Sequence, residues 1–129
     1  MIDIRVVMKT ITNDKVVFID IDDTLVMWGE TYWKPTPNTM RLVDPYDKRS
    51  VYLKPHIRHM DLIRKYKAQD YYVIVWSAGG SLWAEHVIKR LQLDDVVDLV
   101  ISKPLKYIDD LPATEILGIR VYIPYKEEI

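Results

Sequence analysis

The stretch Val16-Val-Phe-Ile-Asp-Ile-Asp-Asp-Thr-Leu25 is the most informative part of the sequence. Its first four residues are apolar and mostly β-branched, which predicts a strand buried on both faces that runs directly into three carboxylates. Because side chains two residues apart point the same way in an extended backbone, Asp20 and Asp22 are expected on one side. Neighbouring carboxylates repel each other unless a cation or a shared proton intervenes, and Mg²⁺ prefers oxygen ligands. The sequence therefore predicts an ion-binding edge where this strand ends.

Three further apolar runs predict parallel core strands, because each is bounded by polar residues and rich in β-branched side chains. They cover residues 71–76, 96–101 and 119–123. Apolar residues at helical spacing predict helices over residues 55–69 and 81–91 and a short helix over residues 112–117. Strands that alternate with helices indicate the α/β class with right-handed crossovers. We therefore expect a three-layer, Rossmann-like domain around a central, mostly parallel sheet.

Residues 25–54 do not follow this alternation. They contain three prolines and a pattern that predicts a hairpin, with strands at residues 40–43 and 51–53. A segment this short rarely folds by itself, since about 40 residues are usually needed, so we expect it to lie on the core as a flap. The chain of 129 residues has the length of one domain. We expect residues 1–129 to form that domain, with the flap inserted after the first core strand and an edge strand at residues 4–8.

The composition is that of an ordinary globular protein, with 49% hydrophobic and 29% charged residues and a formal net charge of -1. This balance argues against a disordered tail and against nucleic-acid binding through an overall positive charge. The chain has no cysteine, which excludes disulfides, a thiol nucleophile and cysteine-ligated zinc. No stretch approaches the ~18 apolar residues of a membrane span, and the start lacks the features of a signal peptide. We therefore expect a soluble, cytoplasmic protein with no membrane partner.

The order of polar residues along the chain resembles that of the haloacid dehalogenase (HAD) superfamily. The first motif of that superfamily is an apolar strand followed by Asp-x-Asp-x-Thr, which here is Asp20-Ile-Asp-Asp-Thr24. Its later signals follow in order, as Ser77 and Lys103 after predicted strands and the pair Asp109-Asp110 after Tyr107-Ile108. The resemblance covers about residues 15–124 and implies a HAD-like fold. Neither place where members insert a cap domain has room for one here, so the resemblance implies a capless phosphatase-type member.

The resemblance also implies a reaction, which is the Mg²⁺-dependent hydrolysis of a phosphate monoester through an aspartyl-phosphate intermediate. Asp20 is implied to attack the phosphorus. Asp22 is implied to protonate the leaving alcohol and later to take a proton from the hydrolytic water. Thr24 is implied to orient the loop that carries both. Because HAD enzymes that cleave carbon–halogen bonds lack the second Asp of the motif, Asp22 favours phosphoryl transfer.

Further residues are implied to bind phosphate and metal. The Ser77 hydroxyl can donate to a phosphoryl oxygen, and the helix N-terminus that follows it favours an anion. Lys103 supplies a positive charge, with Lys106 as the competing candidate. The expected phosphate-binding residues are Ser77, Ala78, Gly79 and Lys103. The expected metal ligands are Asp20, the backbone carbonyl of Asp22, Asp110 directly and Asp109 through water, with the order of the last two left open.

An open site without a cap favours substrates that bring their own bulk, such as nucleic-acid ends or phosphoproteins, or closure by homo-oligomerisation. Residues 34–67 hold nine Lys or Arg against three Asp, and aromatic residues nearby could stack on bases. These are Trp28, Tyr32, Trp33, Tyr46 and Tyr52. The alternative is that the aromatic residues pack the flap and the basic residues form a solvated helix face. A nucleotide or nucleic-acid substrate is therefore a hypothesis.

Two other functions compete with a phosphatase. One is a non-catalytic HAD-like binding protein. The other is a receiver-type phosphorylation switch, since Asp22-Asp23, Ser77 and Lys103-Pro104 superficially match such a domain. A receiver, however, needs its phosphoacceptor Asp at the end of a central strand, and the run at residues 71–76 is followed by Ser77. The flap would also be unexplained in a receiver, so we favour the enzyme.

Some residues have simpler interpretations. His56 and His59 lie one helical turn apart, but no third ligand is near in the sequence, so an exposed helix surface is favoured over a metal site. Trp76 and Trp83 are predicted to pack in the core. The pair Asp109-Asp110 has a structural alternative, in which it caps the short helix at residues 112–117.

Overall fold

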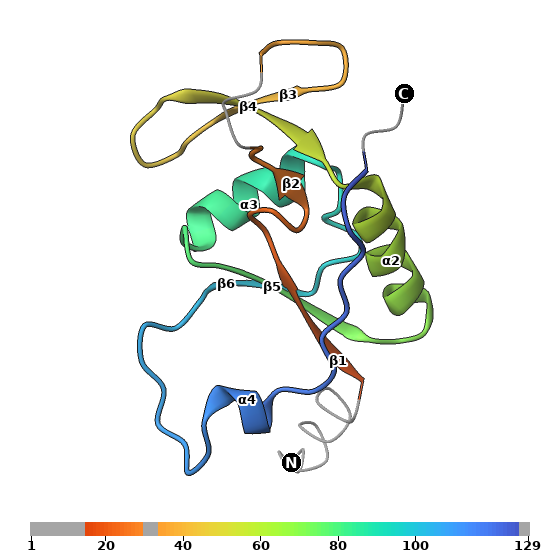
Figure 1. The fold of residues 1–129 in the computed structure, drawn as a ribbon, viewed down its shortest axis with the longest axis vertical. Coiled ribbons are helices and arrows are strands. Elements are labelled where there is room, and N and C mark those ends of the chain that lie inside the picture. The colour runs from red at the N-terminus through yellow and green to blue at the C-terminus, as the bar shows by residue number, and fades with distance from the viewer. Residues whose placement is uncertain (1–14, 30–33, 127–129) are drawn as a thin grey trace, which may run out of the picture.

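The computed structural model describes residues 15–29 and 34–126, and its strands and helices alternate along the chain (Figure 1). In chain order they are β1 (Val16–Asp20), β2 (Val26–Met27), β3 (Met40–Val43), β4 (Ser50–Pro55), α2 (Ile57–Ala68), β5 (Tyr72–Ser77), α3 (Ser81–Arg90), β6 (Leu99–Ser102) and α4 (Ala113–Ile116). The edge strand predicted at residues 4–8 lies outside the described residues. Among the helices that are described, none has the length and apolarity needed to cross a bilayer.

Three strands form a parallel sheet in the order β1-β5-β6, which confirms the α/β class and the parallel sheet. Asp20 pairs with Trp76, and Ser77 pairs with Ser102. All three strands therefore end at one edge, where the residues that follow them come together. The last of these strands begins at Leu99, later than the predicted start at residue 96.

The helices α2 and α3 cover one face of this sheet. Along β5 every second residue is buried, and both connections advance in the same direction, so right-handed crossovers place the two helices on the same side. The helical residues buried in this core are Met60, Ile63, Trp83, Ala84, Val87 and Ile88. The predicted core position of Trp83 is thus confirmed, and the spacing of these residues explains why the two segments are amphipathic helices.

Within residues 15–29 and 34–126 the opposite face of the sheet is less covered, and the third predicted layer is not found there. Phe18 is exposed and packs edge-to-face on Trp76, with ring centroids 4.6 Å apart. Trp76 is half-buried and does not belong to the core as predicted. The short helix α4 buries none of its residues. The described part of the chain therefore has two layers, because nothing after β6 packs a third one onto this face.

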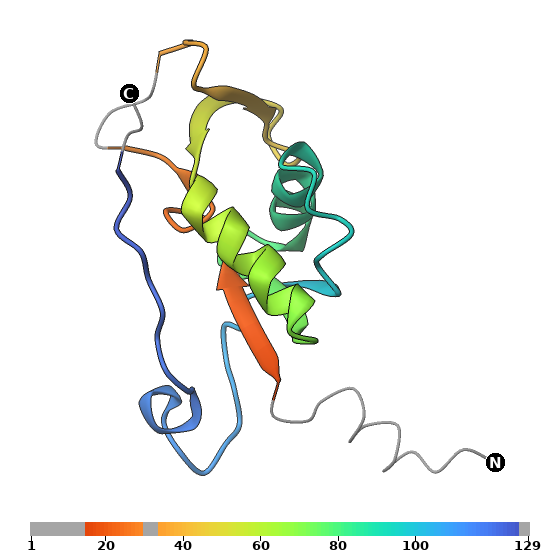
Figure 2. The same cartoon turned by 90° about the vertical axis from the view of Figure 1, so that its right-hand side faces the viewer.

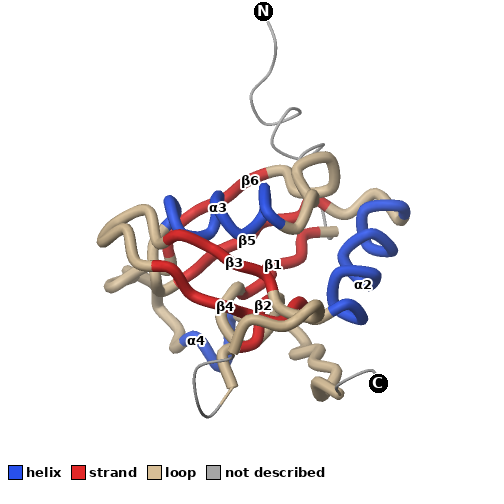
Figure 3. The backbone as a smooth tube through the Cα atoms, turned by 90° about the horizontal axis from the view of Figure 1, so that it is seen from above, coloured by secondary structure: helices blue, strands red, loops and turns tan. Residues whose placement is uncertain are grey.

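The flap forms its own antiparallel sheet, in the order β2-β4-β3, and contains the predicted hairpin. Leu42 and Leu53 are buried in the main core, and the Val43 amide donates to His86 Nε2 of α3 at 3.3 Å. As seen from above in Figure 3, the flap strands lie across the end of the molecule beside α3. The flap strands therefore lie on the core, where Leu42 and Leu53 are buried and α3 supplies the His86 contact.

The segment after β6 differs from the prediction. Residues 119–123, predicted as a core strand, run as an extended segment without strand pairing, and Ile119 is 94% exposed. Figure 2 shows the flap at one end of the molecule, and α4 with its preceding loop at the other. A strand needs a neighbour for its backbone hydrogen bonds, and this segment finds side-chain partners instead.

Those partners are two histidines at the start of α2, which are buried and not on an exposed helix surface as predicted. His56 and His59 retain 1% and 5% exposure, and their rings stack with centroids 3.7 Å apart. The Ile123 amide donates to His59 Nε2 at 2.8 Å, and the Ile123 carbonyl accepts from His56 Nε2 at 2.7 Å. The C-terminal segment is therefore fixed along α2 and does not join the sheet.

Candidate active site

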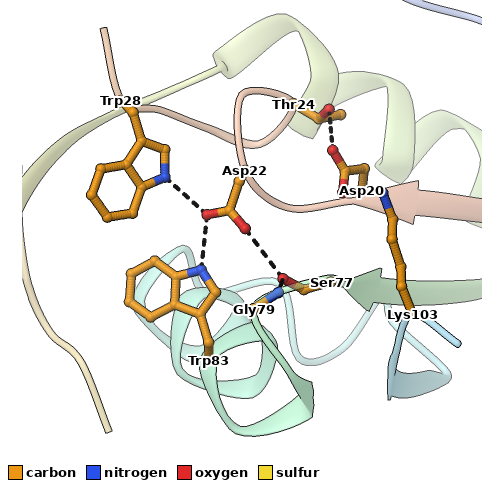
Figure 4. Close-up of polar contacts among 8 residues, drawn as sticks. All are labelled: Asp20, Asp22, Thr24, Trp28, Ser77, Gly79, Trp83 and Lys103. Carbon is orange, nitrogen blue, oxygen red and sulfur yellow. Dashed lines mark hydrogen bonds and ion pairs between the residues drawn. The ribbon is translucent and has the colours of Figure 1, made fainter. Parts of the chain in front are cut away.

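The common edge of the three parallel strands carries most of the predicted catalytic residues (Figure 4). Asp20 is the last residue of β1, Ser77 is the last residue of β5, and Lys103 directly follows β6. The Lys103 amide also donates to the Ser77 carbonyl at 2.9 Å. The parallel register thus brings together side chains that are far apart in the sequence, as the strand pattern predicts.

Asp20 is held at both of its carboxylate oxygens. Lys103 Nζ lies 2.9 Å from Oδ1, and Thr24 Oγ1 donates to Oδ2 at 2.9 Å. The Asp20 and Lys103 side chains retain 32% and 35% exposure, so the ion pair is open to solvent and to an incoming anion. The lysine that contacts Asp20 is Lys103, whereas Lys106 is exposed in the loop that follows. These contacts fix the direction of the carboxylate while leaving it accessible.

Asp22 is held by three donors from outside its own loop. Trp28 Nε1 and Trp83 Nε1 both donate to Oδ1, at 2.8 and 3.0 Å, and Ser77 Oγ donates to Oδ2 at 3.2 Å. The two tryptophans come from the start of the flap and from α3. Sequence reasoning assigned them to flap packing or base stacking and to the core, because nothing in their spacing indicates a shared hydrogen-bond acceptor. The two predicted carboxylates are thus adjacent but have different partners.

The loop between β1 and β2 is a tight turn that fixes both acids. The amides of Leu25 and Val26 donate to the Ile21 carbonyl at 2.8 and 3.2 Å, and all three side chains are fully buried. Asp23 adopts φ 59°, a left-handed conformation that Asp tolerates better than most residues. Its carboxylate accepts the Trp28 amide at 3.0 Å. The buried side chains and the turn together set the spacing between Asp20 and Asp22.

A second support for this loop comes from His59. A carbonyl can only accept, so the Nδ1 of His59 carries the proton that it donates to the Thr24 carbonyl at 2.7 Å. Burial lowers the pKa of His59, and the hydrogen bond to Thr24 opposes that effect only in part. Tyr122 Oη donates to the Asp23 carbonyl at 3.1 Å. The C-terminal segment and α2 therefore hold the backbone of this loop by hydrogen bonds to its carbonyl groups. The sequence alone does not indicate these contacts.

The turn after β5 forms the side of the site that is expected to receive phosphate. The Gly79 amide donates to Ser77 Oγ at 3.0 Å, and Ser77 itself is fully buried. Gly80 adopts φ 99°, and a Cβ at this position would collide with the Tyr46 hydroxyl of the flap. Ala78 and Gly79 are exposed beside the hydroxyl. The predicted phosphate-binding residues thus lie together, with glycine required where the flap and the turn meet.

Asp109 and Asp110 are not part of this cluster. Both are exposed in the loop before α4, and Asp109 Oδ1 accepts the nearby Leu111 amide at 3.0 Å. That loop lies toward the end of the molecule where β1 begins, whereas Asp20 lies where β1 ends (Figures 1 and 2). The described residues contain no group of three or more His, Cys, Asp or Glu able to hold a metal ion. The predicted four-acid metal set is therefore not assembled, because no strand beside β1 carries this pair to the edge.

Comparison with known protein families gives a match, and it covers the part of the chain that forms this site. Residues 15–105, more than two thirds of the chain, match the family model of the NLI interacting factor-like phosphatases. The match includes all of the clustered residues from Asp20 to Lys103 and ends before Asp109. No curated protein and no solved structure matches the chain.

Proposed function

The chain belongs to the NLI interacting factor-like phosphatase family, which is HAD-like, and we propose that it hydrolyses phosphate monoesters through an aspartyl phosphate on Asp20. The observation that carries this proposal is the partly exposed Asp20 carboxylate, oriented by Thr24 and Lys103 beside the Ser77 hydroxyl. A partly exposed nucleophile with a cation beside it supplies two of the groups that in-line phosphoryl transfer requires, and the buried Ser77 hydroxyl at the same edge of the sheet is the candidate donor.

In the first half of the reaction, an Asp20 carboxylate oxygen bonds to phosphorus. The bond between phosphorus and the ester oxygen breaks, and its electron pair goes to that oxygen, which takes a proton from Asp22. Lys103 and the Ser77 hydroxyl stabilise the negative charge on the transferring group. The product is an alcohol and an acyl phosphate on Asp20.

In the second half, water attacks the phosphorus of the acyl phosphate. Asp22, now ionised, takes a proton from the water, and the bond between phosphorus and the Asp20 oxygen breaks. Inorganic phosphate leaves and both carboxyl groups return to their starting states. Asp22 thus acts as acid and then as base, which requires its carboxyl group to stay in one place throughout.

We propose Mg²⁺ as the cofactor of this site. Protein-bound Mg²⁺ usually takes one or two carboxylates and completes its shell with substrate phosphate and water. Asp20 supplies such a carboxylate, and its ion pair with Lys103 supports a cation at this position. The backbone carbonyl of Asp22 is the second ligand that we propose. When bound, the ion neutralises charge on the phosphoryl group. Asp109 and Asp110 are left out of this set.

The substrate that we propose is a bulky phosphoester, because Asp20 and Lys103 lie at an open edge. The narrower proposal of a nucleotide or nucleic-acid end has less support. Arg49, Arg64 and Lys67, three of the nine basic residues at 34–67, form ion pairs with acids. Turnover of 3′- or 5′-phosphorylated oligonucleotides should exceed that of sugar phosphates if the narrower proposal holds, and equal or slower turnover removes it.

The test of the function is Mg²⁺-dependent phosphate release from an aryl phosphate, with Asp20→Asn as the matched variant. We expect release by the wild type, and loss of at least about a hundredfold in the variant. Stable labelling by acetyl phosphate without turnover would instead support a receiver-type switch, although the central strand β5 ends in Ser77 and not in an acid. No turnover and no labelling would support a non-catalytic binding protein.

A further inference from the structure

Two indole groups converge on a single oxygen of Asp22. Trp28 Nε1 and Trp83 Nε1 donate to Oδ1 at 2.8 and 3.0 Å, and their ring centroids lie 6.1 Å apart. Figure 4 shows the two N–H groups pointing to this oxygen from the flap side and from α3. Trp83 is 4% exposed, so the surrounding core fixes its ring. We call Trp28 and Trp83 the indole clamp.

The clamp fills the hydrogen-bonding capacity of Oδ1. A carboxyl oxygen has two lone pairs, and here two N–H donors occupy them. An ionised carboxylate accepts at both oxygens, whereas a neutral carboxyl accepts at its carbonyl oxygen and carries its proton on the other. Both forms of Asp22 can therefore keep both indole hydrogen bonds, provided that the proton always sits on Oδ2.

The other oxygen of Asp22 has a weaker and replaceable partner. Ser77 Oγ donates to Oδ2 at 3.2 Å, the longest of the three contacts, while the Gly79 amide holds Oγ at 3.0 Å. A hydroxyl has one hydrogen to donate, so it cannot serve Oδ2 and a phosphoryl oxygen at the same time. When substrate phosphate takes this hydrogen, Oδ2 is released.

We propose that the indole clamp makes Trp28 and Trp83 positioning residues, which hold Oδ1 as a permanent acceptor and confine the transferable proton of Asp22 to Oδ2. This inference rests on the proposed phosphatase function. The proton moves from Oδ2 to the ester oxygen as the bond between that oxygen and phosphorus breaks, and it returns to Oδ2 from the attacking water. The clamp keeps the carboxyl group in one orientation through both steps.

The clamp also connects the acid to two separate parts of the fold. Trp28 directly follows β2, which pairs with the flap strand β4, and Trp83 lies in the first turn of α3 beside the phosphate-binding turn. A shift of either element would move a donor of Oδ1. Misplacement of a catalytic group by about 1 Å can cost on the order of a hundredfold in rate, so a fixed carboxyl group matters.

The kinetic test uses Trp28→Phe and Trp83→Phe, which keep an aromatic ring and remove the N–H. Poor leaving groups need the proton most, and kcat/KM reports only the steps through departure of the alcohol, so we expect kcat/KM to fall about tenfold with an alkyl phosphate and less than about threefold with p-nitrophenyl phosphate. KM should stay within about twofold, because neither indole N–H is assigned to phosphate. Tyr71→Phe is the control, since it removes a polar group from an aromatic ring at the opposite end of the sheet. Equal losses with both esters, a change in KM alone or no loss would overturn the proposal.

A second measurement does not depend on activity or on the folding of the tryptophan variants. In a ¹H–¹⁵N spectrum, Asp22→Ala removes the shared acceptor, and the indole signals of Trp28 and Trp83 should both shift and exchange faster. Asp22→Asn keeps a carbonyl oxygen and should preserve both signals while it abolishes turnover. Trp76, which does not contact Asp22, is the internal reference. If only one of the two indole signals shifts in Asp22→Ala, or neither does, the proposal that both indoles donate to Asp22 is overturned. If the wild type hydrolyses no ester, the proposed function fails, while these spectra still decide on the clamp.

Discussion

The chain contains two acidic pairs that are both predicted to bind metal, Asp20 with Asp22 and Asp109 with Asp110. The structure places the first pair among hydrogen-bond donors and a lysine, and the second pair in an exposed loop. The first pair receives hydrogen bonds or an ion pair from three residues that are distant in the sequence, Ser77, Trp83 and Lys103, and from Trp28 at the start of the flap. For the second pair, the hydrogen bond that the structure shows comes from Leu111, two residues away from Asp109. A pair of carboxylates forms a candidate active site when neighbouring strands and hydrogen-bond donors hold it in a fixed position. Two acidic residues in the sequence are not sufficient.

The largest expected difference between the pairs is in activity. Asp22→Asn should lower kcat by at least about a hundredfold, because general acid and base catalysis is lost. The double variant Asp109→Asn with Asp110→Asn should stay within about threefold of the wild type, since both residues are exposed and remote from the cluster. Both are measured by phosphate release at saturating substrate. A comparable loss in both variants would show that the loop before α4 joins the site during turnover, and would break the comparison.

The next effect concerns the cation beside the first pair. Lys103→Met should lower kcat about a hundredfold, because the charge that faces both Asp20 and the transferring phosphoryl group is removed. Lys106→Met, three residues later and exposed, is the matched control and should keep near-normal activity. Steady-state kinetics on one aryl phosphate measures both. If Lys106→Met is the more damaged variant, the assignment of the lysine is wrong.

The third prediction compares the effect on protein stability of replacing Gly80, at the active-site edge, and Gly118, after α4. Gly80→Ala should destabilise the fold by about 1–3 kcal/mol, because φ is 99° and the new Cβ would meet the Tyr46 hydroxyl. Gly118→Ala should change the free energy of unfolding by less than about 0.5 kcal/mol, since nothing lies within 4 Å of its Cβ position. Urea unfolding of the two variants gives both values. Similar destabilisation would show that the C-terminal segment is as tightly packed as the active-site edge.

The smallest effect is a dependence of stability on pH through His59. Burial lowers its pKa below the ordinary 6.5, so the unfolded chain binds more protons than the folded chain in the window below that value. Stability should be complete above about pH 6.5 and should fall as the pH decreases toward the lowered pKa. In His59→Gln, which cannot titrate, the midpoint of urea unfolding should lose this part of its pH dependence. An unchanged pH profile in that variant would assign the effect to another group.

Local patterns in the sequence predict much of the site. The strand that ends in Asp20, the alternation of strands and helices, and the flap hairpin follow from periodicity and from the rule that parallel strands end at one edge. Asp20, Ser77 and Lys103 meet for that reason. These features depend on residues that are close in the sequence or on regular geometry.

The features that the sequence does not predict all depend on contacts between distant segments. Residues 119–123 have the composition of a strand, but two histidines of α2 take the backbone hydrogen bonds of Ile123. Trp28 and Trp83 look like packing residues until the fold points both N–H groups at Asp22. Periodicity describes a single segment and carries no information on such partners.

The most direct test of the account is to locate the phosphorylated residue. Wild-type protein and Asp22→Asn are incubated with p-nitrophenyl phosphate, whose alcohol leaves without needing the acid, so that the variant should accumulate the intermediate. Both are then quenched and treated with borohydride, which reduces an aspartyl phosphate to homoserine. Peptide mass spectrometry should then find homoserine at position 20 and at no other acidic position. Homoserine at another Asp, or continued turnover with none at position 20, would contradict the assignment of Asp20 as the nucleophile.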